Sequence, residues 1–239
     1  MGKCQNMSSV KKIICLANSW KNKERCIAGI DLDTGNWIRP VCDQYDDGRV
    51  PRNIRLVAGR EPELLDILEI PLADTGENFG FESENLTILP GEWQLVGKAK
   101  PEDVLQYSWK DRYILHNPIK YVKESYLKSL PFENRRTLQL IYAENLDVKS
   151  QENETGLTKW KGTLENTSGQ KLTEVRITDP AFISKLDAGY QIKGNYLITV
   201  SLGMPGQYMG WEEENYCWKL IAGVIEIDEL SNRQLTLDL

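Results

Sequence analysis

Short runs of β-branched and apolar residues, each ended by a polar turn, recur along the whole of this 239-residue chain. Such runs are typical of strands, and their roughly even spacing favours small barrels or sandwiches. The runs in the first part of the chain are Val10–Asn18, Glu24–Leu32, Trp37–Val41, Leu64–Leu72, Asn85–Leu89, Glu92–Lys98 and Arg136–Ala143. Those in the second part are Leu157–Leu164, Leu172–Ile177, Tyr196–Leu202 and Cys217–Ile227. We therefore expect a mainly β fold, with short helices from Pro101, over Tyr121–Leu130 and over Pro180–Leu186.

One stretch without any apolar residue divides the chain. Lys149–Gly156 reads KSQENETG, a composition typical of a linker. A chain of 239 residues is long enough for two small domains. We therefore predict a barrel with a helical insertion over residues 1–148 and a second barrel over residues 157–239.

Charge is distributed unevenly along a chain whose net charge is −6. Residues 1–60 contain eleven Lys and Arg residues against six Asp and Glu residues, so the rest of the chain is strongly acidic. A basic N-terminal third can form a local surface for anions, although acids from elsewhere in the fold could also balance it. Residues 203–239 carry seven acids against Lys219 and Arg233, which suits docking of a partner protein better than phosphate contact.

Four segments carry a resemblance to a known family. They are KKIICLANSWKNKERCIAGIDLDTGNWIRPV (Lys11–Val41), DILEIPL (Asp66–Leu72), GNYLITVSLGMP (Gly194–Pro205) and YCWKLIAGVIEI (Tyr216–Ile227). Together they resemble the bacterial dual OB-containing domain family over essentially the whole chain. The resemblance implies two OB-type barrels that recognise nucleic acid or nucleotides in prokaryotic conflict (defence) settings.

An OB barrel binds single strands with aromatic platforms for the bases and a basic groove for the phosphates. The expected ligand contacts of the first barrel are Ser19, Trp20, Lys21, Arg25, Trp37 and Arg39. Trp37 and Arg39 share one face of a strand because side chains alternate with a period of two. Either this face is open to ligand, or Trp37 packs in the core and Arg39 forms a structural ion pair.

Two polar residues in the strand runs of the second barrel are further candidates for ligand contact. Ser201 and Lys219 lie within apolar strand runs, where a polar side chain is unexpected. We expect a half-exposed strand to explain them, with ligand contact from the second barrel as the alternative.

No catalytic residue, metal site or cofactor is predicted. The single histidine, His116, has no recognisable nucleophile partner, and no phosphate-binding or dinucleotide-binding glycine motif occurs. The five cysteines lack a paired C-x-x-C spacing and are expected to be buried thiols. Asp43, Asp46 and Asp47 are expected to form an acidic surface turn. Glu144, Asp147 and Lys149 only loosely match the acids and lysine of a metal-dependent nuclease.

We expect a non-enzymatic, cytoplasmic binding module, since no export signal or membrane-spanning run is found in the sequence. Its expected partner is single-stranded nucleic acid or a nucleotide-like anion, bound near residues 19–39. Two alternatives stay open. One is an adaptor subunit of a defence complex that docks a protein effector through the acidic C-terminal barrel, and the other is a metal-dependent nuclease.

Overall fold

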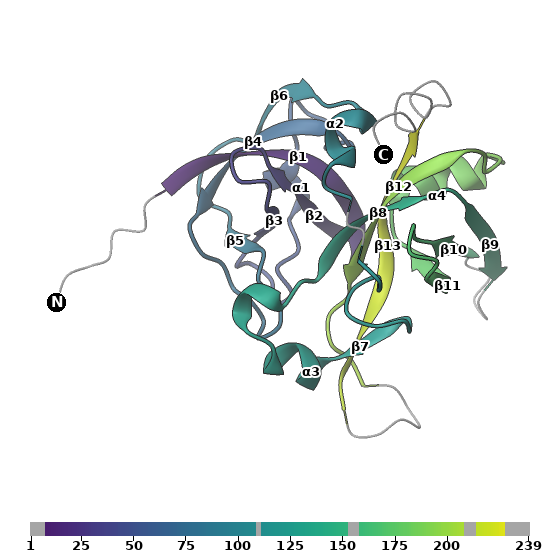
Figure 1. Cartoon of the computed structure of the whole chain (residues 1–239). Helices are drawn as coiled ribbons and strands as arrows, with labels where there is room; N and C mark the ends of the chain where they lie inside the picture. Colours follow the sequence, from purple (N-terminus) through teal and green to yellow (C-terminus); the bar gives the residue numbers. More distant parts are fainter. Residues whose placement is uncertain (1–7, 109–110, 153–157, 208–213, 228–239) are drawn as a thin grey trace. The chain divides into compact units, whose positions relative to one another are not determined.

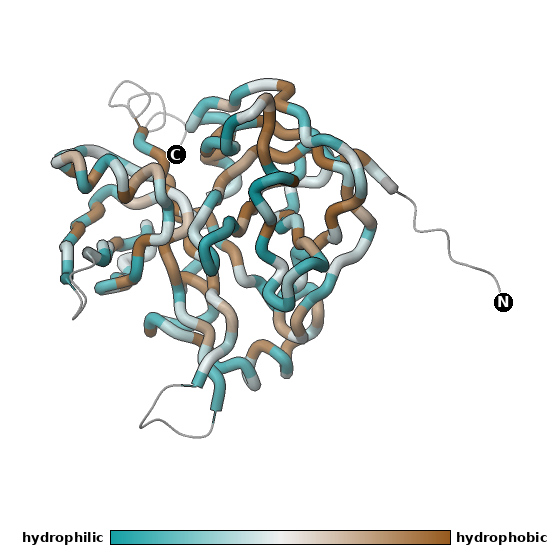
Figure 2. Tube along the Cα trace, turned by 180° about the vertical axis from the view of Figure 1, so that it is seen from behind, coloured by the Kyte–Doolittle hydropathy of each residue, from teal (hydrophilic) through white to brown (hydrophobic). Residues whose placement is uncertain are grey.

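The computed structural model of the chain describes residues 8–108, 111–152, 158–207 and 214–227 (Figure 1). The chain forms two compact units, residues 1–99 and residues 100–239. Apolar residues gather on the strands and polar residues on the turns and helices (Figure 2). None of the helices in the described ranges is long and apolar enough to cross a membrane.

The first unit is built on one long strand, drawn in purple in Figure 1. β1 (Ser8–Lys21) pairs along one edge with β2 (Glu24–Asp31) and along the other with β4 (Asp66–Ala73). A β-bulge between Cys15 and Ala17 lets the strand bend between these two partners. The remaining elements of this unit are β3 (Trp37–Val41), α1 (Arg52–Arg55), β5 (Asn85–Thr87) and β6 (Gln94–Lys98).

Hydrogen bonds close these strands into a barrel. β3 pairs in parallel with β5, and a bridge joins Leu72 of β4 to Ile88, the residue after β5. The ring therefore runs β1, β2, β3, β5, β4 and back to β1, with α1 between β3 and β4 in the chain. This is the connectivity of a five-stranded OB barrel.

Buried apolar side chains fill the first barrel. Its core is Ile13, Cys15, Ile27, Ile38, Val50, Val57, Leu68, Ile70, Leu72 and Trp93. In β2, a Cβ added at Gly29 would lie 2.1 Å from the carbonyl oxygen of Ile14, so only glycine fits where the two strands approach.

The second unit repeats the barrel after a helical lead-in. The lead-in holds α2 (Pro101–Leu105), β7 (Tyr121–Lys123), α3 (Glu124–Ser129) and the 3₁₀ turn η1 (Phe132–Asn134). The barrel elements are β8 (Leu138–Ala143), β9 (Leu146–Glu152), β10 (Thr158–Glu165), β11 (Lys171–Ile177), α4 (Pro180–Asp187), β12 (Asn195–Leu202) and β13 (Tyr216–Ile227).

The pairing of the second unit follows that of the first. β11 and β13 pair in parallel, as β3 and β5 do, and α4 precedes β12 as α1 precedes β4. β8 pairs with β12 as the first half of β1 pairs with β4, and β9 pairs with β10 as the second half of β1 pairs with β2. β8 and β9 together therefore correspond to β1. The interruption at Glu144 and Asn145 takes the place of the bulge in β1. The predicted fold class, two OB-like barrels with short helices, is confirmed.

The linker predicted over Lys149–Gly156 is wrong for its described residues. Lys149–Glu152 belongs to β9 and pairs with β10 from Lys161 back to Thr158. The tract carries no apolar side chain because β9 has one neighbouring strand and this end of it is exposed. The division into units after Ala99 also differs from the predicted ranges 1–148 and 157–239, since β8 and β9 together form the first strand of the second barrel.

Candidate ligand-binding surface at the end of the β1–β2 hairpin

A two-residue turn joins β1 to β2. Both turn residues have positive φ, 48° at Asn22 and 69° at Lys23, as in the hairpin turns that match the right-handed twist of strands. The turn sets the register so that Trp20 faces Arg25 and Lys21 faces Glu24. The residues of this turn and of the strand ends beside it therefore project from one end of the first barrel.

Trp20 and Arg25 form the centre of this surface. The guanidinium carbon of Arg25 lies 3.6 Å from the centre of the Trp20 ring, and Trp20 is 46% exposed. Arg25 shares its face of β2 with the core residue Ile27, so the pair lies at the end of the barrel interior. An exposed indole beside a guanidinium is a combination that stacks on nucleobases and attracts phosphate.

A second segment packs against the turn. Lys21 Nζ donates to the backbone carbonyl of Asp47, and the amide of Asn22 donates to the Asp47 carboxylate at 2.7 Å. Arg49 also contacts the turn, because its guanidinium donates to the backbone carbonyl of Asn22 at 3.4 Å. The same guanidinium lies 4.0 Å from the centre of the Tyr45 ring. We call Trp20, Lys21, Lys23, Arg25, Tyr45 and Arg49 the hairpin cluster.

The hairpin cluster has a positive charge excess. It contains four cations, and the carboxylate of Asp47 lies 3.5 Å from one of them, Arg49. The other nearby acid, Glu24, pairs with the buried side chain of Arg55, whose hydrogen bond lowers the pKa of Glu24. Glu24 is thus engaged elsewhere, and the cluster offers an anion more positive than negative charge.

The remaining predicted residues of the first barrel are buried or half-buried. Ser19 is 8% exposed, facing Cys26 in the register. Trp37 is half-buried, and its Nε1 has no hydrogen-bond partner among the described residues. Neither side chain forms part of the hairpin cluster.

Arg39 is a structural residue in this arrangement, not a ligand contact. It is 2% exposed and forms ion pairs with Glu82 and with Glu84, the latter at 3.1 Å. Burial opposes its charge, but the two carboxylates outweigh burial and raise the pKa of Arg39. Its backbone N–H also donates to Glu84 at 2.8 Å. Arg39 thereby fixes the β4–β5 connection onto β3, and the ligand-facing interpretation of this residue is corrected to the structural ion pair.

The two predicted residues of the second barrel are buried as well. Ser201 is 8% exposed and donates to the carbonyl of Leu202 at 3.2 Å. Lys219 is 1% exposed, and its Nζ donates to the carbonyls of Ile114 and Asn117 and to the side chain of Asn117 at 2.5, 2.6 and 3.1 Å. The half-exposed strand expected for both residues is wrong, and so is a surface contact to ligand.

Burial lowers the pKa of Lys219 to about 7. The side chain holds the segment before β7 onto β13 through neutral oxygens. Such a lysine is a structural tie whose charge depends on pH.

No group of three or more His, Cys, Asp and Glu side chains is arranged to hold a metal ion within the described ranges. Glu144 lies between β8 and β9, while Asp147 and Lys149 lie in β9. His116 Nε2 donates a hydrogen bond at 2.6 Å to the carbonyl of Arg136, and burial lowers the pKa of His116.

Two residues of the hairpin cluster, Tyr45 and Arg49, were not predicted from the sequence as ligand contacts. Tyr45 lies in the loop interpreted as an acidic surface turn, and Arg49 opens the arginine-rich stretch from Gly48 to Arg60. Alternation along strands could not find them, because both residues lie in the loop after β3.

Comparison with known proteins agrees with this architecture. No curated protein and no solved structure matches the chain. The dual OB-containing domain family matches residues 11–224, which span both barrels. The chain therefore belongs to the dual OB-containing domain family.

Proposed function

We propose that the first barrel binds single-stranded nucleic acid, or a nucleotide-like anion, at the hairpin cluster. The observation that supports this most is the exposed Trp20 ring with Arg25 over it. A base can stack on the indole or on the guanidinium plane, because both present a flat face. The same pair lies beside Lys21, the last residue of β1, and Lys23 of the turn.

The proposed ligand follows from charge and shape together. Four cations within two short segments suit a backbone with several phosphates. The chain as a whole has a net charge of −6, so we expect binding through this local surface and weak attraction elsewhere. Single strands fit better than a duplex, since stacking requires bases that are not already stacked on their neighbours.

Fluorescence anisotropy with labelled oligothymidine and oligouridine of about 12 nucleotides tests the proposal. We expect both to bind more tightly than a duplex of the same length. If all four cations contact phosphates, the slope of log K against log salt concentration should be about −3. Absence of binding at low salt, or binding that salt does not weaken, would count against the proposal.

The second candidate function is protein docking by the acidic part of the chain. Two of its carboxylates are already paired within the second unit, Glu214 with Lys123 at 2.7 Å and Glu226 with Lys185 at 2.7 Å. These pairs reduce the charge available to a partner. Apolar docking would show little salt dependence, so the same titration separates it from strand binding.

A further inference from the structure

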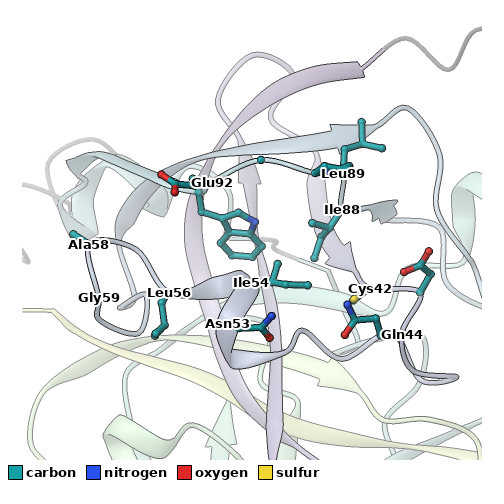
Figure 3. Close-up of a pocket in the computed structure, with 14 residues that line it drawn as sticks. Cys42, Gln44, Asn53, Ile54, Leu56, Ala58, Gly59, Ile88, Leu89 and Glu92 are labelled. Atoms are coloured by element: carbon teal, nitrogen blue, oxygen red, sulfur yellow. The ribbon is translucent and has the colours of Figure 1, made fainter.

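The first barrel contains a pocket that the hairpin cluster does not use. Its volume is about 650 Å³, within the range of sites for small organic ligands. It lies between α1 and the connection from β5 to β6, and Figure 3 shows side chains from both segments around it. None of the residues of the hairpin cluster lines it.

The inner part of the pocket is apolar and carries one buried polar atom, the indole nitrogen of Trp93. Ile54 of α1 and Ile88 after β5 are half-buried, and Trp93 is 4% exposed. Trp93 Nε1 is buried and finds no hydrogen-bond partner in the described part of the chain. A buried indole N–H normally finds an acceptor, so this one, like that of Trp37, leaves a hydrogen-bond donor unsatisfied among the described residues.

The rim of the pocket is polar and negatively charged. Asp43, Gln44, Asn53 and Glu92 are all exposed, and the described lining contains no Lys, Arg or His. Asp43 and Glu92 form no ion pair with any other described residue. Their charge therefore remains available to a ligand and repels anions.

We propose that this pocket binds a small organic amine with an apolar body. The ammonium group would lie against a rim carboxylate, Asp43 or Glu92, and the apolar body would cover Ile54, Ile88 and the Trp93 ring. The pocket thus has the opposite charge preference to the hairpin cluster, and it stands whether or not the hairpin cluster binds nucleic acid.

Three compounds that share a phenyl ring but carry a positive, zero or negative charge test the proposal. We would titrate the full chain with 2-phenylethylamine, 2-phenylethanol and 3-phenylpropionate, using calorimetry and the indole N–H resonances in a nitrogen–proton correlation spectrum. The Trp93 resonance would be assigned from the missing signal of Trp93→Phe. We expect a Kd of about 1 mM for the amine, weaker binding of the alcohol, weakest binding of the acid, and a shift of the Trp93 resonance with the amine.

Charge variants separate this site from unspecific attraction. The double variant Asp43→Asn with Glu92→Gln should raise the Kd of the amine about fivefold and leave that of the alcohol unchanged. Asp74→Asn removes an exposed acid outside the pocket and should change neither the Kd of the amine nor that of the alcohol. The proposal is overturned if the acid binds as tightly as the amine, if no amine binding appears at about 10 mM, or if the double variant binds the amine like the unaltered chain.

Discussion

The guanidinium of Arg25 covers the exposed ring of Trp20 at 3.6 Å, on strands whose register places the two residues opposite each other. The contact lies at the end of the first barrel, where the Trp20 ring is exposed while the Nε and Nη1 atoms of Arg25 are buried. Stacking on the ring fixes the orientation of the guanidinium, so the pair is preorganised for a ligand with a ring and a phosphate.

Trp20→Ala should weaken binding of oligothymidine ten- to a hundredfold, because stacking on one aromatic ring is worth about 1–3 kcal/mol. Trp20 is 46% exposed, so the free energy of unfolding should fall by about 1 kcal/mol at most. Anisotropy and thermal unfolding on the same preparations measure the two effects. If Trp20→Ala binds oligothymidine as tightly as the unaltered chain does, Trp20 does not contact the ligand.

Arg39→Met should lower the free energy of unfolding by about 3–5 kcal/mol, because it leaves Glu82 and Glu84 buried without their cation. Adding Glu82→Gln and Glu84→Gln should recover part of this loss, since the amides carry no charge. Urea denaturation measures both variants. A loss below about 1 kcal/mol for Arg39→Met would show that the pair does not hold the barrel.

Lys219 should make stability depend on pH. In the unfolded chain it keeps a pKa near 10.5, while in the folded chain burial lowers its pKa to about 7. Between these values the unfolded state binds more protons, so the free energy of unfolding should rise with pH by about 1.4 kcal/mol per unit. Below pH 7 the residue is charged in both states and adds no slope.

The comparison with Lys219→Met isolates this effect from other titrating groups. One of them is Tyr190, whose pKa is raised by burial and by neighbouring Tyr196 and Glu226 and which opposes stability at the alkaline end. The difference in unfolding free energy between the two proteins should change with pH across the interval from 7 to 10.5. A constant difference would mean that Lys219 keeps its ordinary pKa in the fold.

Fragments should reveal where the chain divides. Residues 1–99 contain a closed ring of strands and should fold alone with a β-rich circular dichroism spectrum. Residues 157–239 lack β8 and β9, the first strand of the second barrel, and should not fold. A cooperative thermal transition for the fragment 157–239 would instead support the division predicted from the sequence.

The strands were predictable because each is a short apolar run between polar turns, as in Glu24–Leu32 for β2 and Cys217–Ile227 for β13. The same rule fails for β9, whose exposed residues Lys149–Glu152 carry no apolar signal. Local composition reports burial, and an exposed strand in a barrel is held by its backbone hydrogen bonds.

The candidate site was predictable only in part, for a related reason. Trp20, Lys21 and Arg25 lie beside a turn, where polar and aromatic residues are open to solvent. Alternation correctly placed Trp37 and Arg39 on one face of β3, but it carries no information on what covers that face. Glu82 and Glu84, which bury Arg39, are more than forty residues further along the chain.

The salt dependence of binding for Arg25→Ala, measured beside Lys12→Ala, tests the proposed site most directly. Lys12 lies toward the other end of β1, paired on the surface with Glu69 at 3.2 Å, so it matches the loss of charge away from the hairpin cluster. We predict that Arg25→Ala makes the slope of log K against log salt concentration shallower by about 0.7, while Lys12→Ala leaves it unchanged. Equal slopes for the unaltered chain and Arg25→Ala, or an equal change in both variants, would contradict a ligand site at the hairpin cluster.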